Sequence, residues 1–159
     1  MGFAEIATIN TAIHDTLKNA DDELAKYSQN YDEITEGLLN TPMLQTYWVN
    51  SNTGEATDRA TFRGGLRVQD YLFNVDLYLD QRAFSDAVYT QMFPLFDKVE
   101  QVLLAQLVKP YFGLIDTDGN PIIKSYHYRT ERATFEYQGN DNLITVYPGV
   151  RFSLDIRVF

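Results

Sequence analysis

The sequence predicts an α+β domain, mainly an antiparallel sheet with its helices packed on one face. Two kinds of hydrophobic spacing predict it. Apolar residues recur at three- and four-residue steps in two long segments, which is the period of an amphipathic helix. Elsewhere they alternate with polar residues, which is typical of strands with one buried face. The resulting order is α-β-β-α-β-β, and 159 residues fit a single domain spanning residues 1–159.

The two helical segments are expected at residues 3–27 and 83–109. The apolar stripe of the first consists of Ile6, Ile9, Ile13, Leu17, Ala20 and Leu24. The stripe of the second consists of Val88, Met92, Leu95, Val99, Val102, Leu103 and Leu107. Pro94 lies inside the second segment, so we expect a kink there or the start of a separate helix. A short helical turn is also expected at residues 34–39.

The first two strands are expected at residues 43–50 and 66–80. Between them, the Ser-Asn-Thr-Gly sequence of residues 51–54 has turn chemistry. The polar stretch that follows, to residue 65, predicts a loop or a hairpin arm. We expect residues 51–65 to be poorly ordered in an isolated subunit and ordered in an assembly. In the second strand the odd positions from Tyr71 to Leu79 are apolar, so this face should be buried.

The last two strands are expected at residues 122–137 and 143–159, joined by a hairpin turn at 139–142. Pro148 and Gly149 should interrupt the final strand or mark a bulge. The even positions from Val150 to Val158 are apolar, and we expect them to be buried within the subunit.

The expected strands are long for a domain of this size. A compact chain of this length has a diameter of roughly 40 Å, whereas an unbroken strand over residues 66–80 would span about 50 Å. The strand ends therefore either project as arms or pair with a neighbouring subunit, unless bends shorten them.

The charge distribution narrows the classes of partner. The formal net charge is −9, and residues 1–40 carry eight acidic side chains against two lysines. An acidic chain repels phosphate backbones, which disfavours nucleic-acid binding, although the charge can equally serve solubility alone. The chain has no cysteine, which excludes disulfides and thiolate chemistry. Neither a signal peptide nor a membrane-spanning segment is expected.

The sequence contains no motif that predicts catalysis, a metal site or a cofactor. His14 and His127 are isolated, and the Asp-Thr-Asp-Gly-Asn sequence at residues 116–120 lacks the glycine and glutamate spacing of a calcium loop. Asp76 and Asp80 share a strand face, which we interpret as a solvated sheet face. The aromatic and basic run at residues 126–129 could stack single-stranded bases or could equally be part of a sheet face.

The arginines are the candidates for a protein interface, because the planar guanidinium binds carboxylates with two hydrogen bonds. The candidate residues lie around one loop and on the polar face of the last strand, and they are Arg59, Arg63, Arg67, Arg151, Asp155 and Arg157. The acidic first forty residues could supply the partner charges in a neighbouring copy. The alternative is a solvated surface with ion pairs inside the subunit.

The order of elements, together with several segments, resembles the tail terminator proteins of long-tailed bacteriophages, especially the lambda type, and the related neck and tail-completion proteins. The segments that carry the resemblance are Tyr47-Trp48-Val49, residues 71–79, the Met92-Phe93-Pro94-Leu95-Phe96 sequence with its aromatic-proline pair, and the alternating final strand. The resemblance covers most of the chain as a pattern.

The resemblance implies a structural virion protein and no enzyme. It implies a ring, usually a hexamer, assembled in the host cytoplasm, that caps the tail tube. One face would contact the tail tube protein and the other the head-side connector or stopper protein, while genomic DNA passes through the lumen without specific binding. No cofactor and no membrane contact are implied.

Two other classes of function compete with this interpretation. One is a monomeric or dimeric binding module of ferredoxin-like build, for a small ligand or single-stranded nucleic acid. The other is an enzyme that uses a carboxylate pair, which would require a concave site. Mass in solution separates the ring from the binding module.

Overall fold

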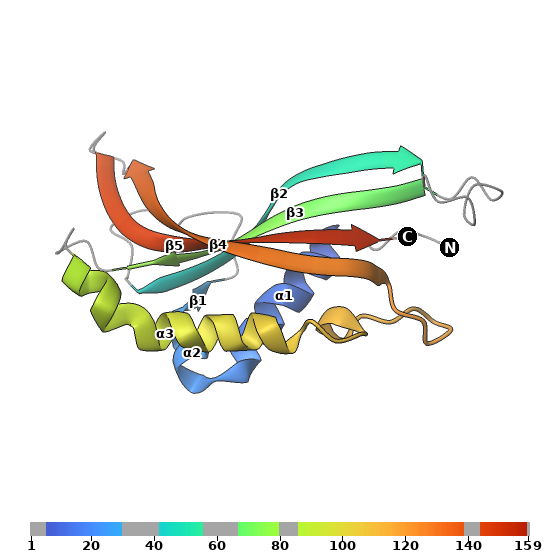
Figure 1. Ribbon diagram of the computed structural model, residues 1–159, viewed down its shortest axis with the longest axis horizontal. Coiled ribbons are helices and arrows are strands. Elements are labelled where there is room, and N and C mark those ends of the chain that lie inside the picture. Colours follow the sequence, from blue (N-terminus) through green and yellow to red (C-terminus); the bar gives the residue numbers. More distant parts are fainter. Residues whose placement is uncertain (1–5, 30–41, 56–66, 80–85, 139–143, 159) are drawn as a thin grey trace.

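The protein consists of one twisted sheet with a layer of helices against one of its faces (Figure 1). The computed structural model describes residues 6–29, 42–55, 67–79, 86–138 and 144–158. The elements are α1 (Ile6–Ala20), α2 (Asp22–Tyr27), β1 (Ser28–Gln29), β2 (Met43–Glu55), β3 (Arg67–Tyr78), α3 (Asp86–Ala105), the 3-10 helix η2 (Tyr111–Gly113), β4 (Ile123–Gln138) and β5 (Ile144–Val158). The predicted turn segments 34–39 and 139–142 lie outside the described residues.

The order of strands in the sheet is β1-β2-β3-β5-β4. The four long strands are each antiparallel to their neighbours, and the two-residue β1 adds a short parallel pairing at Leu44 and Gln45 of β2. The α+β prediction, with a mainly antiparallel sheet and helices on one face, is therefore confirmed. We call the helix-covered side of the sheet the core face and the other side the open face.

The core face follows the predicted alternation. The odd residues from position 71 to position 79, along β3 and just past its end, and the even residues of β5 from position 150 are buried, as expected: Tyr71, Phe73, Val75, Leu77, Leu79, Val150, Phe152, Leu154, Ile156 and Val158. Ile9, Ile13 and Leu17 of α1 and Leu95, Val99 and Leu103 of α3 pack against them. Burial of so many large apolar side chains, each contributing about 1.5–3 kcal/mol, is the main stabilising term of the fold.

The first helical segment divides in two, so the prediction of one helix over residues 3–27 is wrong. Asp21 has an extended backbone and caps α2, because its Oδ1 accepts a hydrogen bond of 2.8 Å from the backbone N–H of Glu23. This hydrogen bond lowers the pKa of Asp21. Lys98 of α3 holds the cap in place, with its Nζ 3.3 Å from Asp21 Oδ1 and 2.7 Å from Glu23 Oε2.

The second helical segment is shorter than predicted. α3 ends at Ala105, and Leu107, which was expected in its buried stripe, is 42% exposed. Pro94 lies inside the helix. In Figure 1 the axis of α3 bends within its N-terminal half, the part that contains Pro94, which agrees with the expected kink.

The predicted turn at residues 51–54 is wrong, because β2 continues to Glu55. Pairing with β3 over the whole length, for example Ser51 with Tyr71, overrides the local turn propensity. The register shifts between Trp48 and Asn50, so Val49 is the extra residue of a β-bulge. Residues 56–65, the rest of the segment expected to be poorly ordered, lie outside the described residues.

The expected interruption at Pro148 and Gly149 is also wrong. β5 pairs with β4 through both residues without a register shift. The partner strand β3 ends at Tyr78 opposite Gly149, so Pro148 lies beyond the last strand pair on that side, where a missing N–H is tolerated. The five residue pairs from Thr134–Pro148 to Gln138–Ile144 continue past the end of β3, as a two-stranded arm of the kind that the strand lengths predict.

Gly149 is needed where this arm leaves the sheet. A Cβ at this position would lie 2.3 Å from the carbonyl oxygen of Leu77 and 2.3 Å from Cε2 of Phe135. The ring of Phe135 lies over the glycine and stacks on Tyr78 with a centroid distance of 4.4 Å. Phe135 and Tyr78 form a small apolar cluster with Met43 and Tyr147 on the open face, apart from the main core. The cluster fixes the base of the arm to the body of the sheet.

Candidate interaction surface

The open face has a buried carboxylate at its centre. Asp76 of β3 is only 1% exposed, although it lies on the face opposite the helices that the structure describes. Arg151 of β5 donates to it from Nε at 2.9 Å and from Nη2 at 3.1 Å. The hydroxyl of Tyr47 on β2 donates to Oδ2 at 2.6 Å. The strand register brings the three side chains together. Asp76 lies directly opposite Arg151 in the β3–β5 pair and diagonally opposite Tyr47 in the β2–β3 pair.

These contacts extend into a polar network across three strands. Asn74 donates to the Tyr47 hydroxyl at 3.2 Å, and Ser153 donates to Asn74 Oδ1 at 3.3 Å. Tyr78 donates to Gln45 Oε1 at 3.1 Å. Hydrogen bonding to Asp76 raises the pKa of Arg151, and burial raises the pKa values of Tyr47 and Tyr78. The network therefore keeps its arginine charged and its tyrosines neutral, which suits a structural role in fixing strand register.

The interpretation of Asp76 as part of a solvated face is wrong. Its carboxylate is enclosed by Tyr47 and Arg151, two long side chains on the neighbouring strands. Asp80, the other member of the proposed pair, lies outside the described residues.

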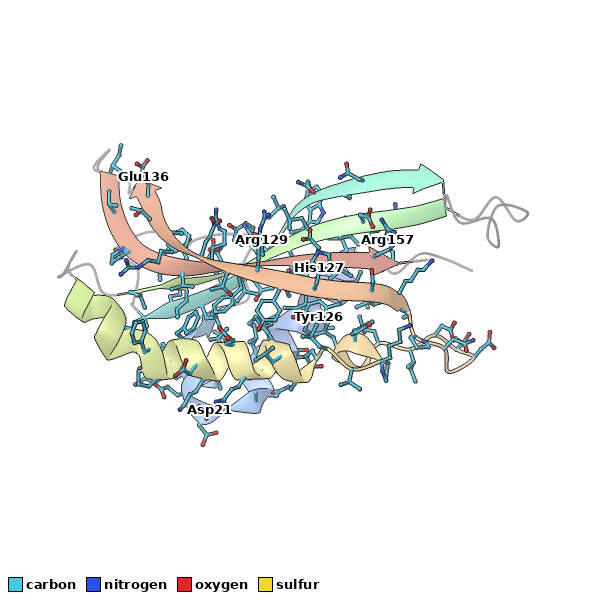
Figure 2. All side chains as sticks on the ribbon, in the orientation of Figure 1. Asp21, Tyr126, His127, Arg129, Glu136 and Arg157 are labelled. Carbon is cyan, nitrogen blue, oxygen red and sulfur yellow. The ribbon has the colours of Figure 1, made fainter. Side chains whose placement is uncertain are left out.

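The other charges on the open face form exposed pairs. Arg157 donates two hydrogen bonds, of 2.7 and 3.0 Å, to the carboxylate of Asp70. Nε2 of His127 lies 3.1 Å from Oδ2 of Asp155. Figure 2 shows His127, Arg129 and Arg157 on this face of the sheet and Tyr126 on the helix side. Such exposed pairs each contribute about 0–1 kcal/mol to the stability of the fold, so a binding partner could replace them at little cost.

The predicted interface residues are brought together only in part. Arg151, Asp155 and Arg157 do line the open face of β5, but each has a partner within the subunit, as the alternative interpretation expects. Arg67 begins β3, where its backbone pairs with Glu55. Arg59 and Arg63 lie outside the described residues. Asp76 and Tyr47 were missed, since only the strand register reveals that they meet Arg151.

The aromatic run at residues 126–129 does not form an exposed stacking platform. Tyr126 is buried and donates a hydrogen bond of 3.3 Å to the carbonyl oxygen of Leu103. Its ring meets that of Phe112 edge to face, with a distance of 4.9 Å between the ring centroids. Tyr128 packs against the same core, whereas Arg129 lies on the opposite face. The second interpretation, a sheet face, is therefore the one the structure shows.

The loop after η2 is a turn held by Asp116. Its Oδ1 accepts from the backbone N–H groups of Asp118 and Asn120, each at 2.9 Å. These hydrogen bonds make the segment a side-chain-stabilised turn. Within the described ranges, no three acidic or histidine side chains are grouped closely enough to hold a metal ion.

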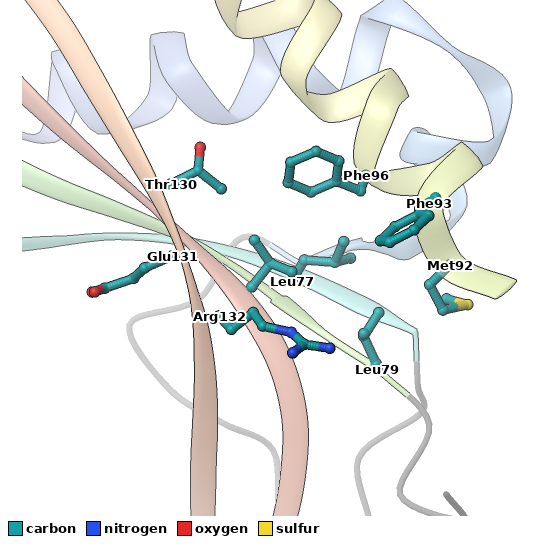
Figure 3. Close-up of a pocket in the computed structure, with 9 residues that line it drawn as sticks. Leu77, Leu79, Met92, Phe93, Phe96, Thr130, Glu131 and Arg132 are labelled. Carbon is teal, nitrogen blue, oxygen red and sulfur yellow. The ribbon is translucent and has the colours of Figure 1, made fainter. Parts of the chain in front are cut away.

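A hollow opens between α3 and the core face, near the base of the arm. Its volume is about 410 Å³. Leu77, Leu79 and Val150 form its floor, and Met92, Phe93 and Phe96 of α3 form its wall. In Figure 3 the guanidinium of Arg132 and the ring of Phe93 lie at opposite sides of the hollow. The hollow is thus mainly apolar with a charged group at its border.

None of the helices that the structure describes has the length and apolarity needed to cross a membrane. The chain matches no protein-family model, and a search of curated proteins finds no relative.

Proposed function

We propose that this protein is a structural, non-enzymatic virion component that forms a ring, with six copies as the expected number. The ring would cap a phage tail tube, contact the tail tube protein on one side and the head-side connector on the other, and let the genome pass through its lumen. The proposal extends the resemblance of the sequence to tail terminators, and one feature of the sheet supports it most directly.

That feature is the pair of opposite sheet edges. β2 and β4 are the outer two of the four long strands, which lie in the order β2-β3-β5-β4. Because each of the four is antiparallel to the next, β2 and β4 run in opposite directions. A second copy could therefore place its β2 antiparallel to β4 of the first, and the same contact could repeat around a ring. No described strand covers β4 on its outer side or β2 beyond Gln45. Uncovered edges of this length are typical of surfaces that pair in an assembly.

Charge supports passage of DNA without binding. Six copies at −9 would carry a formal charge of −54, which repels a polyanion at long range. Arg151 and Arg157 on the open face have carboxylate partners in their own sheet, which lowers their attraction for phosphate.

The test is the mass of the purified chain in solution, followed by electron microscopy. We expect a closed ring with a central opening, and we expect the chain in purified tailed particles. A monomer at all concentrations, absent from particles, would refute the proposal.

The apolar hollow favours a second candidate, a monomeric or dimeric binding module for a small ligand. A hollow of about 410 Å³ is large enough for a small molecule. Native mass spectrometry distinguishes the two, because a binding module would appear as a monomer or dimer with a bound small molecule.

A further inference from the structure

The edge strand β2 exposes Trp48, the one tryptophan of the chain. Its side chain is 42% exposed, and Val49, the extra residue of the bulge, is 37% exposed beside it. No residue of β2 from Met43 to Asn52 carries a charge. Edge strands that stay unpaired often carry charged side chains, which oppose pairing with other chains. An uncharged edge that exposes a tryptophan is instead typical of an interface, where tryptophan is enriched.

The opposite edge of the sheet carries an aromatic side chain in the same row. Trp48 pairs with Phe73 of β3, and Phe73 pairs with Leu154 of β5. Leu154 pairs in turn with Tyr128 of the edge strand β4. Directly paired residues point to the same face, and Phe73 and Leu154 are buried in the core face, so the whole row lies on that face. Tyr128 is half-buried at its outer end.

The two rings at the ends of this row cannot meet within one copy, because three strand spacings of ~4.8 Å separate them by roughly 14 Å. They meet when two copies are joined by the β2–β4 pairing of the proposed ring. A copy that is displaced across the strands, without a slide along them, has its Trp48 opposite Tyr128 of its neighbour. This displacement keeps the strand directions and the faces unchanged. The contact and the edge pairing therefore require the same arrangement of copies.

The surroundings of Tyr128 suit an indole ring. The centroid of its ring lies 6.2 Å from that of Tyr126 and 6.4 Å from that of Phe152. Burial and the nearby carboxylate of Glu100 on α3 raise the pKa of Tyr128. Arg129, the next residue of β4, lies on the opposite face (Figure 2). An indole placed here would thus meet aromatic rings and would have a carboxylate within the same region as an acceptor for its N–H.

We propose that Trp48 of one copy packs against Tyr128 of the adjacent copy, and that this aromatic pair anchors the β2–β4 contact and fixes its register. The inference rests on the proposed function, because it assigns a side-chain contact within the ring. It commits the exposed tryptophan to a second copy of this chain, and it specifies which rows of the two edge strands face each other.

Intrinsic fluorescence tests the burial of Trp48, because no other tryptophan contributes to the signal. We expect rings to emit at shorter wavelength than diluted monomers and to be quenched less by acrylamide. Trp48→Ala changes an exposed side chain, so the melting temperature of the dilute monomer should stay unchanged. The protein concentration needed for half-assembly should rise about tenfold or more. Val108→Ala, at a 72% exposed position outside β2 and β4, is the matched control and should assemble like the wild type.

Disulfide formation tests the register, because the chain has no cysteine of its own. Trp48→Cys and Tyr128→Cys are made separately, one with a tag that shifts its mass, then mixed at high protein concentration and oxidised. We expect disulfide pairs only in the mixture, each joining a tagged to an untagged chain. Trp48→Cys mixed with Thr134→Cys is the control and should give no pair. Thr134 is exposed on β4, but it lies six positions, or roughly 20 Å, beyond Tyr128.

The outcomes separate this contact from the ring itself. Rings in which Trp48 is as accessible to acrylamide as in the monomer, or in which position 48 links to 134 instead of 128, would overturn the contact and leave the proposed function standing. Rings of Trp48→Ala that form at wild-type concentrations would overturn the anchoring role, even if Tyr128→Cys does not fold. A wild-type chain that stays monomeric at all concentrations would refute the proposed function, and absence of the 48–128 link would then also refute the contact.

Discussion

The Nε atom of Arg151 lies 2.9 Å from Oδ1 of Asp76, a carboxylate that is buried in the open face of the sheet rather than under the helices. Replacing Arg151 with alanine would leave this carboxylate with Tyr47 as its side-chain donor among the described residues. Because an uncompensated buried charge is costly and Arg151 itself is about one third exposed, we expect a loss of about 2–4 kcal/mol in the free energy of unfolding. Urea denaturation measures it.

Arg157→Ala is the matched control for this prediction. Arg157 also binds an aspartate on β3 with two hydrogen bonds, but both side chains are close to half exposed. The expected loss is within about 1 kcal/mol. In addition, Asp76→Asn combined with Arg151→Gln should recover part of the stability lost in Arg151→Ala, because the charge is removed with its partner. Equal losses in the two single variants would contradict the distinction.

Gly149→Ala should destabilise the base of the arm. The added methyl group would meet the Leu77 carbonyl oxygen and the Phe135 ring at 2.3 Å, and the carbonyl cannot move without disturbing the strand. We expect a loss of about 1–3 kcal/mol, typical of overpacking. Gly149→Ala combined with Phe135→Leu should be less than additive in thermal denaturation, since removing the ring relieves one of the two contacts. Strict additivity would show that the ring is not the obstacle.

Phe152→Ala should cost about 3–5 kcal/mol, because it removes a fully buried ring from the centre of the core face. The ring stacks on Phe96 of α3 with a centroid distance of 5.5 Å, so its loss also weakens the attachment of the helix. Chemical denaturation measures the effect. Phe93→Ala, at an exposed position of the same helix, is the control and should change stability little. Wild-type stability in Phe152→Ala would mean that β5 does not supply the core.

His14 should make stability depend on pH. Burial lowers its pKa below the ordinary value of 6.5, so the unfolded chain binds a proton more readily than the folded chain. The stability that comes from burying neutral His14 is therefore fully present above pH 6.5. It is lost as the pH falls through 6.5 toward the lower pKa of the folded state. We expect the melting temperature of wild type to fall more steeply over this range than that of His14→Gln.

The sequence was sufficient for the parts of the fold in which local pattern and burial agree. The alternation of β3 and β5 predicted their buried faces residue by residue, because one face of each strand contacts the helices. Turn propensity gave a wrong prediction at residues 51–54, because these turn-forming side chains lie in a strand that pairing with β3 stabilises. The prediction also failed at Asp21, whose capping of α2 depends on a backbone break that apolar periodicity does not reveal.

The open-face network could not be predicted in the same way. Asp76 and Arg151 are 75 positions apart, and only the register between β3 and β5 places them together. Each sequence pattern on its own was compatible with a solvated face. A usable signal did exist, since alternate positions of two neighbouring strands carry opposite charges at Asp70, Asp76, Arg151 and Arg157. Recognising it requires the topology first.

The close approach at Gly149 has an evolutionary consequence. An aromatic ring at position 135 and any side chain at position 149 compete for the same space, so the two positions should vary together in relatives of this protein. Relatives that keep the ring should keep the glycine, and those that lose the glycine should carry a smaller residue opposite it. The pair thus provides a recognition signature for distant relatives, and it is independent of the overall sequence similarity that here detects no family.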